Sequence, residues 1–259
     1  MKASIKFENK LIMVSEMIND STFQVLEFEK LKGACDSDMA AALESINNTG
    51  TKLKQVRITL DNSEVKLEPG AVSYMKGLVD RKNNSLVNAL NKGKKLISNK
   101  FLNDSFDEKP IYEGSGEIFL EPSFSYFVLV ELENEGIIVQ DGLFLACENS
   151  IKLKSINNDR KSELELVGSG IVVLELPVPS EEVFRCKLYN DELKVDGDFV
   201  VLRGSNVEYS YETSSVVSGN GLINIYRGIG DVWLLPTKGS YTDIKNGKDY
   251  IEYEDEDDF

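Results

Sequence analysis

The chain has 259 residues, of which 41% are hydrophobic and 28% are charged, so it can form a sizeable core beneath an ordinary soluble surface. Its formal net charge of −15 disfavours nucleic acid and anionic lipid as default partners, because like charges repel at long range. The sequence contains no histidine, which excludes Ser-His-Asp catalysis, Cys-His catalysis and every histidine-containing metal site.

The N-terminal segment, residues 1–50, is predicted to add a strand and a short helix to the main β core. Phe23, Val25 and Leu31 indicate the strand. Asp36 then precedes an alanine-rich run, which is typical of a helix start because the carboxylate can accept hydrogen bonds from backbone N–H groups. Gly50 is predicted to end this connection, since glycine commonly follows the last turn of a helix.

A two-part pattern occurs three times between residues 51 and 237 and predicts the β core. Its first part is a turn followed by alternating apolar residues, found at Pro69-Gly70, Asp141-Gly142 and Asp196-Gly197. Its second part is Gly-x-Gly followed by another alternating run, found at Gly114–Leu120, Gly168–Leu174 and Gly228–Leu234. The alternation predicts strands with these six side chains in a core: Ile118, Leu120, Val172, Leu174, Val232 and Leu234.

This recurrence predicts an all-β fold with one or two short helices, arranged as a duplicated antiparallel β-sandwich or prism of three repeat units. The paired glycines are interpreted as bulges or tight turns that lead into each strand. A dinucleotide-binding loop is disfavoured, because β-branched and aromatic residues rather than a helix follow each pair of glycines.

A basic insertion, residues 76–110, interrupts the first unit. Arg81–Lys100 carries six bases and no acid, and its apolar spacing indicates a short amphipathic helix. The candidate binding residues for an anionic partner are Arg81, Lys82, Lys92, Lys94, Lys95 and Lys100. The C-terminal segment, residues 238–259, ends in an acidic block, Asp249–Asp258, that is predicted to be a disordered tail. Either this tail covers the basic insertion part of the time, or the two segments are unrelated.

Four runs of the sequence resemble the altered-inheritance-of-mitochondria protein twenty-four family. They are EVKLEPGAVSYMKG (Glu64–Gly77), GSGEIFLEP (Gly114–Pro122), IIVQDGLFLAC (Ile137–Cys147) and GLINIYRGIGDVWLLP (Gly221–Pro236). The resemblance implies a layered antiparallel fold like that of the trp RNA-binding attenuation protein, but neither tryptophan nor RNA binding. It supplies no catalytic residues. Eukaryotic relatives are associated with the mitochondrial inner membrane, whereas this chain lacks a transit peptide, so a bacterial cytoplasmic protein is expected.

The cysteines and the single tryptophan are interpreted as structural residues. Cys35, Cys147 and Cys186 are odd in number and far apart, so they are predicted to be small buried side chains outside any disulfide framework. Their spacing also fits no thiolate metal site. Trp233 lies between two residues that point inward, so both an interface position and a second-layer core position stay open for it.

Carboxylate pairs offer the remaining route to catalysis. Glu131 with Glu133, and Glu163 with Glu165, lie two residues apart on predicted strands, but solvated strand faces are the favoured explanation. No apolar run approaches the ~18 residues that a membrane-spanning helix needs.

These features favour a non-catalytic structural or scaffold protein, without cofactor or metal, that forms a homo-oligomer or binds a protein partner. The alternative is a binding module whose basic insertion contacts an anionic partner, either a lipid headgroup or RNA, although the overall charge disfavours nucleic acid. A carboxylate-based hydrolase is the least favoured function.

Overall fold

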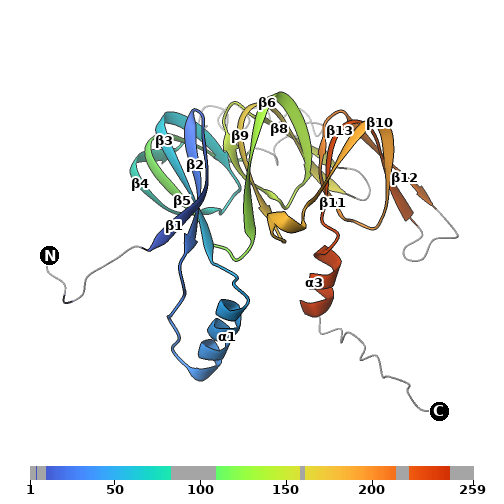
Figure 1. Ribbon diagram of the computed structural model, residues 1–259. Helices are drawn as coiled ribbons and strands as arrows, with labels where there is room; N and C mark the ends of the chain where they lie inside the picture. Colours follow the sequence, from blue (N-terminus) through green and yellow to red (C-terminus); the bar gives the residue numbers. More distant parts are fainter. Residues whose placement is uncertain (1–3, 5–9, 83–108, 158–160, 214–221, 246–259) are drawn as a thin grey trace, which may run out of the picture.

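The computed structural model describes residue 4 and residues 10–82, 109–157, 161–213 and 222–245 (Figure 1). The strands are β1 (Leu11–Ile18), β2 (Ser21–Phe28), β3 (Lys54–Leu67), β4 (Val72–Arg81), β5 (Ile111–Leu120), β6 (Tyr126–Gln140), β7 (Phe144–Glu148), β8 (Lys152–Asn157), β9 (Ser162–Leu176), β10 (Phe184–Asp196), β11 (Val200–Gly204), β12 (Val207–Thr213) and β13 (Leu222–Leu234). The helices are α1 (Ser37–Asn48), the 3-10 helix η1 (Ser180–Glu182) and α3 (Lys238–Lys245). The predicted mostly β class with short helices is confirmed.

The strands form one hydrogen-bonded antiparallel sheet that is folded into three lobes, side by side in Figure 1. The first lobe contains β1 to β5, the second β6 to β9 and the third β10 to β13. Pairing between β3 and β7 joins the first lobe to the second, and pairing between β6 and β11 joins the second to the third. The path through the sheet is β1-β2-β3-β7-β9-β6-β11-β13-β10, and the other strands branch from it.

Both parts of the repeated sequence pattern lie in or beside strands. The Pro-Gly and Asp-Gly dipeptides lie at the connections before β4, β7 and β11, with Asp196 as the last residue of β10. The Gly-x-Gly segments lie within β5, β9 and β13, which confirms that they are part of strands. The alternative interpretation, as tight turns that lead into the strands, is wrong. A bulge with an asparagine at positive φ faces each segment from the neighbouring strand: Asn62 (53°), Asn134 (56°) and Asn190 (67°).

The first glycine of each pair permits a close approach between backbones. All three have φ between 131° and 145°, a region that residues with a side chain rarely adopt. A Cβ atom on Gly114 would lie 2.0 Å from the carbonyl oxygen of Leu78 on the adjacent strand. The corresponding distances to a carbonyl oxygen are 2.5 Å at Gly228 and 3.0 Å at Gly168. The first glycine of each motif therefore allows the backbone of a neighbouring segment to pack where a side chain would not fit.

The apolar core consists of three large clusters, one centred on each lobe. Five of the six side chains predicted to be buried have an exposed fraction of 0%: Ile118, Leu120, Val172, Leu174 and Val232. The prediction is wrong for Leu234, which is half-buried because it lies at the last position of β13 and packs on the margin of the third cluster.

The N-terminal residues form a hairpin before the helix, whereas a single strand was expected. β1 and β2 pair with each other, and β2 pairs with β3, so the hairpin extends the sheet. Leu31 lies outside both strands. The predicted helix start is confirmed, since Asp36 accepts a hydrogen bond of 2.8 Å from the backbone N–H of Met39. No helix within the described ranges is long and apolar enough to cross a membrane.

Candidate functional site

The predicted basic site is described only at its beginning. Arg81 is exposed at the end of β4. Lys82 forms ion pairs with Glu64 and, at 3.0 Å, with Glu113, and its hydrogen bonds to these two carboxylates raise its pKa. The positive charge of Lys82 is therefore balanced within the first lobe. The rest of the predicted site lies outside the described residues, together with the predicted helix and the acidic tail: Lys92, Lys94, Lys95 and Lys100.

Among the described residues, the most deeply buried carboxylate belongs to Glu148, at the end of β7, with an exposed fraction of 1%. Its Oε1 accepts a hydrogen bond of 2.9 Å from the backbone N–H of Ser21. Its Oε2 accepts one of 2.7 Å from Asn19 Nδ2 and one of 3.0 Å from the backbone N–H of Ile171. Glu148 therefore connects the β1–β2 turn to β9, and its oxygens are occupied by structural donors.

A buried ion pair joins the second lobe to the third. Glu163 Oε2 lies 2.7 Å from Arg203 Nη2, and the side chains of the two residues are 8% and 7% exposed. The attribution of Glu163 to a solvated strand face is therefore wrong, because β11 of the third lobe covers it. Glu165 pairs at 3.8 Å with Lys154 and does not share this ion pair. Sequence reasoning missed this contact because it depends on the strand order β9-β6-β11, which brings Arg203 near Glu163.

A lysine and a tyrosine lie beside this ion pair. Lys161 Nζ donates to the hydroxyl of Tyr226 at 3.1 Å and lies 3.0 Å from Asp198 Oδ1. Burial raises the pKa of Tyr226, although the nearby lysine opposes this shift. Burial would lower the pKa of Lys161, but its interactions with Tyr226 and Asp198 outweigh this effect, so the pKa is raised.

These two shifts predict a loss of stability in alkali. The folded protein retains protons on Tyr226 and Lys161 at pH values where the unfolded chain, with ordinary pKa values of 10.0 and 10.5, releases them. The contribution of these two groups to the free energy of unfolding is therefore fully present below pH 10 and falls as the pH rises above it. We expect Tyr226→Phe to flatten this fall in urea unfolding between about pH 9 and 11.5. Tyr189→Phe, at an exposed tyrosine, should leave the wild-type slope unchanged. Equal slopes in all three proteins would contradict the prediction.

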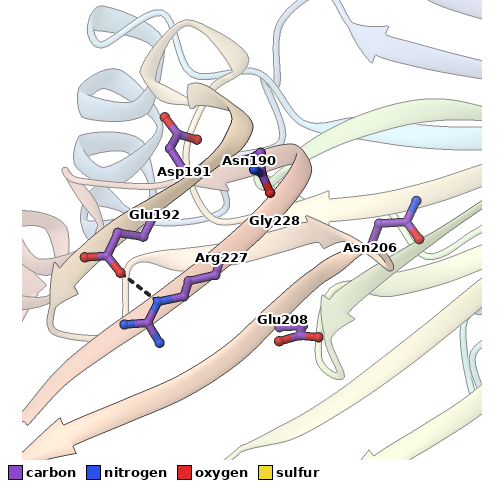
Figure 2. A pocket seen from close by; sticks show the side chains of 7 residues that line it. All are labelled: Asn190, Asp191, Glu192, Asn206, Glu208, Arg227 and Gly228. Carbon is purple, nitrogen blue, oxygen red and sulfur yellow. Dashed lines mark hydrogen bonds and ion pairs between the residues drawn. The ribbon is translucent and has the colours of Figure 1, made fainter.

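An open pocket of about 450 Å³ lies beside the bulge of β10 (Figure 2). On β13, Arg227 is the cross-strand neighbour of both Glu192 and Glu208, and its Nε donates to Glu192 at 2.7 Å. This hydrogen bond lowers the pKa of Glu192. Asp191 accepts a bond of 2.8 Å from the backbone N–H of Tyr189, and Figure 2 shows its carboxylate well apart from that of Glu208. In the described part of the chain, no cluster of acids or cysteines is arranged to hold a metal ion.

A larger groove, of about 690 Å³, lies between the second and third lobes, and Met17 of β1 also contributes to its lining. We call it the junction groove and define it by six of its lining residues: Glu131, Glu135, Glu165, Leu202, Ile229 and Trp233. Arg185 and Asp231 also line it and form a two-point ion pair of 2.6 and 3.1 Å, which lowers the pKa of Asp231. The groove thus combines acidic side chains with apolar ones.

The cysteines differ in environment although all three are free. Cys147 is buried, as predicted, and burial raises the pKa of its thiol to about 12. Cys186 is half-buried at the third cluster. Cys35 is exposed, contrary to the prediction, because it precedes α1, which has no buried residue. Trp233 is half-buried: it packs between the second cluster and a small cluster near α3, and it also lines the junction groove.

Comparison with known proteins identifies a family and a fold. The family model described as Mitochondrial biogenesis AIM24 matches residues 46–237. No curated protein matches the chain. The crystal structure of protein SPYM3_0169 from Streptococcus pyogenes is similar, with a TM-score of 0.54 and 19% sequence identity. The alignment covers 75% of this chain and 94% of that one, and at this identity it shows a shared fold alone.

Proposed function

The chain belongs to the mitochondrial biogenesis AIM24 family, and from this premise we propose that it is a non-catalytic scaffold protein that associates with a second copy of itself. The observation that carries the proposal is the exposed outer edge of β1. This strand is one end of the sheet and pairs only with β2 among the described strands. Four of its apolar side chains are at least half exposed: Ile12 (53%), Met13 (51%), Val14 (50%) and Ile18 (66%).

An unpaired edge of this kind favours pairing with another chain. The outward backbone N–H and C=O groups of an edge strand can accept a further strand, and proteins usually protect such edges with lysine, proline or a covering segment. The edge strand β8 follows this rule, since Lys152 and Lys154 are exposed on it. β1 has no lysine or proline, and its single charge is Glu16. Antiparallel pairing of two β1 strands about a two-fold axis would bury the same apolar side chains on both copies.

The proposal that the protein is non-catalytic rests on the absence of histidine and on carboxylates that are already bound by structural partners. The chain has no histidine. The two most buried carboxylates in the described ranges, Glu148 and Glu163, are occupied by structural partners. In the open pocket beside β10, Glu192 is neutralised by Arg227. Acid–base catalysis needs a carboxylate that can reach a substrate proton, and these groups do not offer one.

The proposal predicts concentration-dependent self-association through β1. We expect light scattering of the purified protein to give at least the mass of a dimer at high concentration. The variant Ile12→Lys/Val14→Lys adds two positive charges to each copy of the edge and should shift the mass to that of a monomer. The matched control is Ile244→Lys on α3, a side chain that is 58% exposed but lies off the sheet, and it should not change the mass. A wild-type protein that stays monomeric at every concentration would refute self-association.

A further inference from the structure

We propose that the junction groove binds an extended segment of a partner protein in which basic and apolar residues alternate. This inference stands on the groove between the second and third lobes and does not depend on self-association through β1. Three features of the described residues carry it: an unpaired strand edge, an apolar lining and an uncompensated negative charge.

The unpaired edge belongs to β6. From Tyr126 to Glu135 this strand pairs with β9 on one side, and its pairing with β11 on the other side begins only at Ile137. No other strand of the described part of the chain pairs with this stretch of β6. From Leu129 to Glu135 its second edge therefore presents backbone N–H and C=O groups next to the groove, and an incoming extended peptide can add a strand there. In Figure 1, β6 lies in the middle lobe on the side that adjoins the third lobe.

The apolar lining comes from both lobes. Leu202 and Trp233 lie where β11 and β13 pair, and Ile229 lies on β13 close by. Ile229 is 60% exposed, and Val167, which also lines the groove, is 40% exposed. Side chains that alternate along an added strand point to its two faces, so one set can cover these apolar residues. Burial of this surface would favour binding.

The negative charge of the groove favours basic residues on the second face of the added peptide strand. Glu131 and Glu135 are exposed, and neither has an ion-pair partner in the part of the chain that the structure describes. The one arginine of the lining, Arg185, is already neutralised by Asp231. Glu165 adds a further carboxylate, which lies 3.8 Å from the ammonium group of Lys154. The lining therefore carries excess negative charge, which attracts lysine or arginine side chains and repels acidic segments.

Binding is testable with a peptide of defined sequence. The probe is a fluorescein-labelled nonapeptide of alternating lysine and valine, KVKVKVKVK, titrated with the full-length protein in fluorescence anisotropy at low salt. We expect binding that Glu131→Lys weakens about fivefold, and Glu131→Lys/Glu135→Lys further, because each reversal replaces attraction with repulsion. The matched control is Glu133→Lys, which makes the same charge change at an exposed position of the same strand but outside the groove lining. It should change the affinity less than twofold.

Two further comparisons separate the groove from general charge attraction and from the β1 edge. A peptide of the same composition with its lysines and valines in two blocks should bind at least fivefold more weakly, because it cannot present alternating faces. The variant Ile12→Lys, on β1 at a side chain outside the groove lining, should retain wild-type affinity for the alternating peptide. The proposal is overturned if Glu131→Lys and Glu133→Lys weaken binding equally, if the block peptide binds as well as the alternating one, or if the alternating peptide does not bind. Circular dichroism of each variant verifies that the fold is intact.

Discussion

Replacing Gly114 with alanine is expected to lower the free energy of unfolding by about 3 kcal/mol or more, because it combines an unfavourable φ with a severe steric clash. The φ of Gly114 is 131°, and an added Cβ would lie 2.0 Å from the carbonyl oxygen of Leu78. That oxygen belongs to the backbone of β4, so the conflict is relieved only if the strand moves. Urea unfolding monitored by circular dichroism measures the loss.

The same geometry predicts an order of effects. Gly228→Ala should destabilise the protein less than Gly114→Ala, and Gly168→Ala least of the three, since their Cβ-to-carbonyl distances rise from 2.0 to 2.5 and 3.0 Å. The control is Gly142→Ala, at a glycine without positive φ and with nothing within 4 Å of an added Cβ. That change should alter the free energy of unfolding by about 0.5 kcal/mol or less. If Gly114→Ala were as mild as Gly142→Ala, the close-approach explanation of the motif would be wrong.

Glu148→Gln is expected to cost about 3 kcal/mol of unfolding free energy although it barely changes the side-chain volume. The two carboxylate oxygens of Glu148 accept bonds from Ser21, Asn19 and Ile171. Glutamine replaces one acceptor oxygen with an NH2 group, so at least one of these donors then faces another donor in a buried site. Chemical unfolding followed by the fluorescence of Trp233, the only tryptophan, measures the effect.

Two further variants separate the role of Glu148 from a general effect of lost charge. Glu133→Gln removes the same charge at an exposed position and should change stability by about 0.5 kcal/mol or less. Gly170→Ala tests the site from the opposite side, because its Cβ would lie 2.7 Å from Glu148 Oε2. It should also destabilise the protein. A Glu148→Gln variant as stable as Glu133→Gln would show that the carboxylate does not hold the β1–β2 turn against β9.

Local sequence signals predicted the class of the fold and several of its elements. Alternation of apolar residues is a property of the strand itself, and it placed five of six chosen side chains in the core correctly. The capping residue Asp36 predicted the start of α1 because a cap acts only on the helix that follows it. Both signals depend only on residues close together in the sequence, so they can be interpreted without the tertiary structure.

The same local signals failed where a residue's role depends on the neighbouring strand. The Gly-x-Gly segments resemble turns in sequence, yet they lie inside long strands. Glycine is needed there because a backbone carbonyl, on the adjacent strand at Gly114 and in the turn before it at Gly168 and Gly228, occupies the space of a side chain. Glu163 was indistinguishable from a solvated acid until the pairing between β6 and β11 placed Arg203 beside it. Glu148 gave no signal at all, because its partners lie 23 to 129 residues away in the sequence.

The sequence by itself determined that this is a mostly β chain without histidine chemistry and with strands of period two, since composition and alternation belong to the chain alone. Only the tertiary structure decided which carboxylates are buried and paired, which strand edges stay open and where acidic and apolar side chains meet in the junction groove. The reason is that strand order and register are long-range properties, set by packing between segments far apart in the chain. The sequence alone does not distinguish a glutamate on an exposed strand edge from one that a neighbouring strand buries.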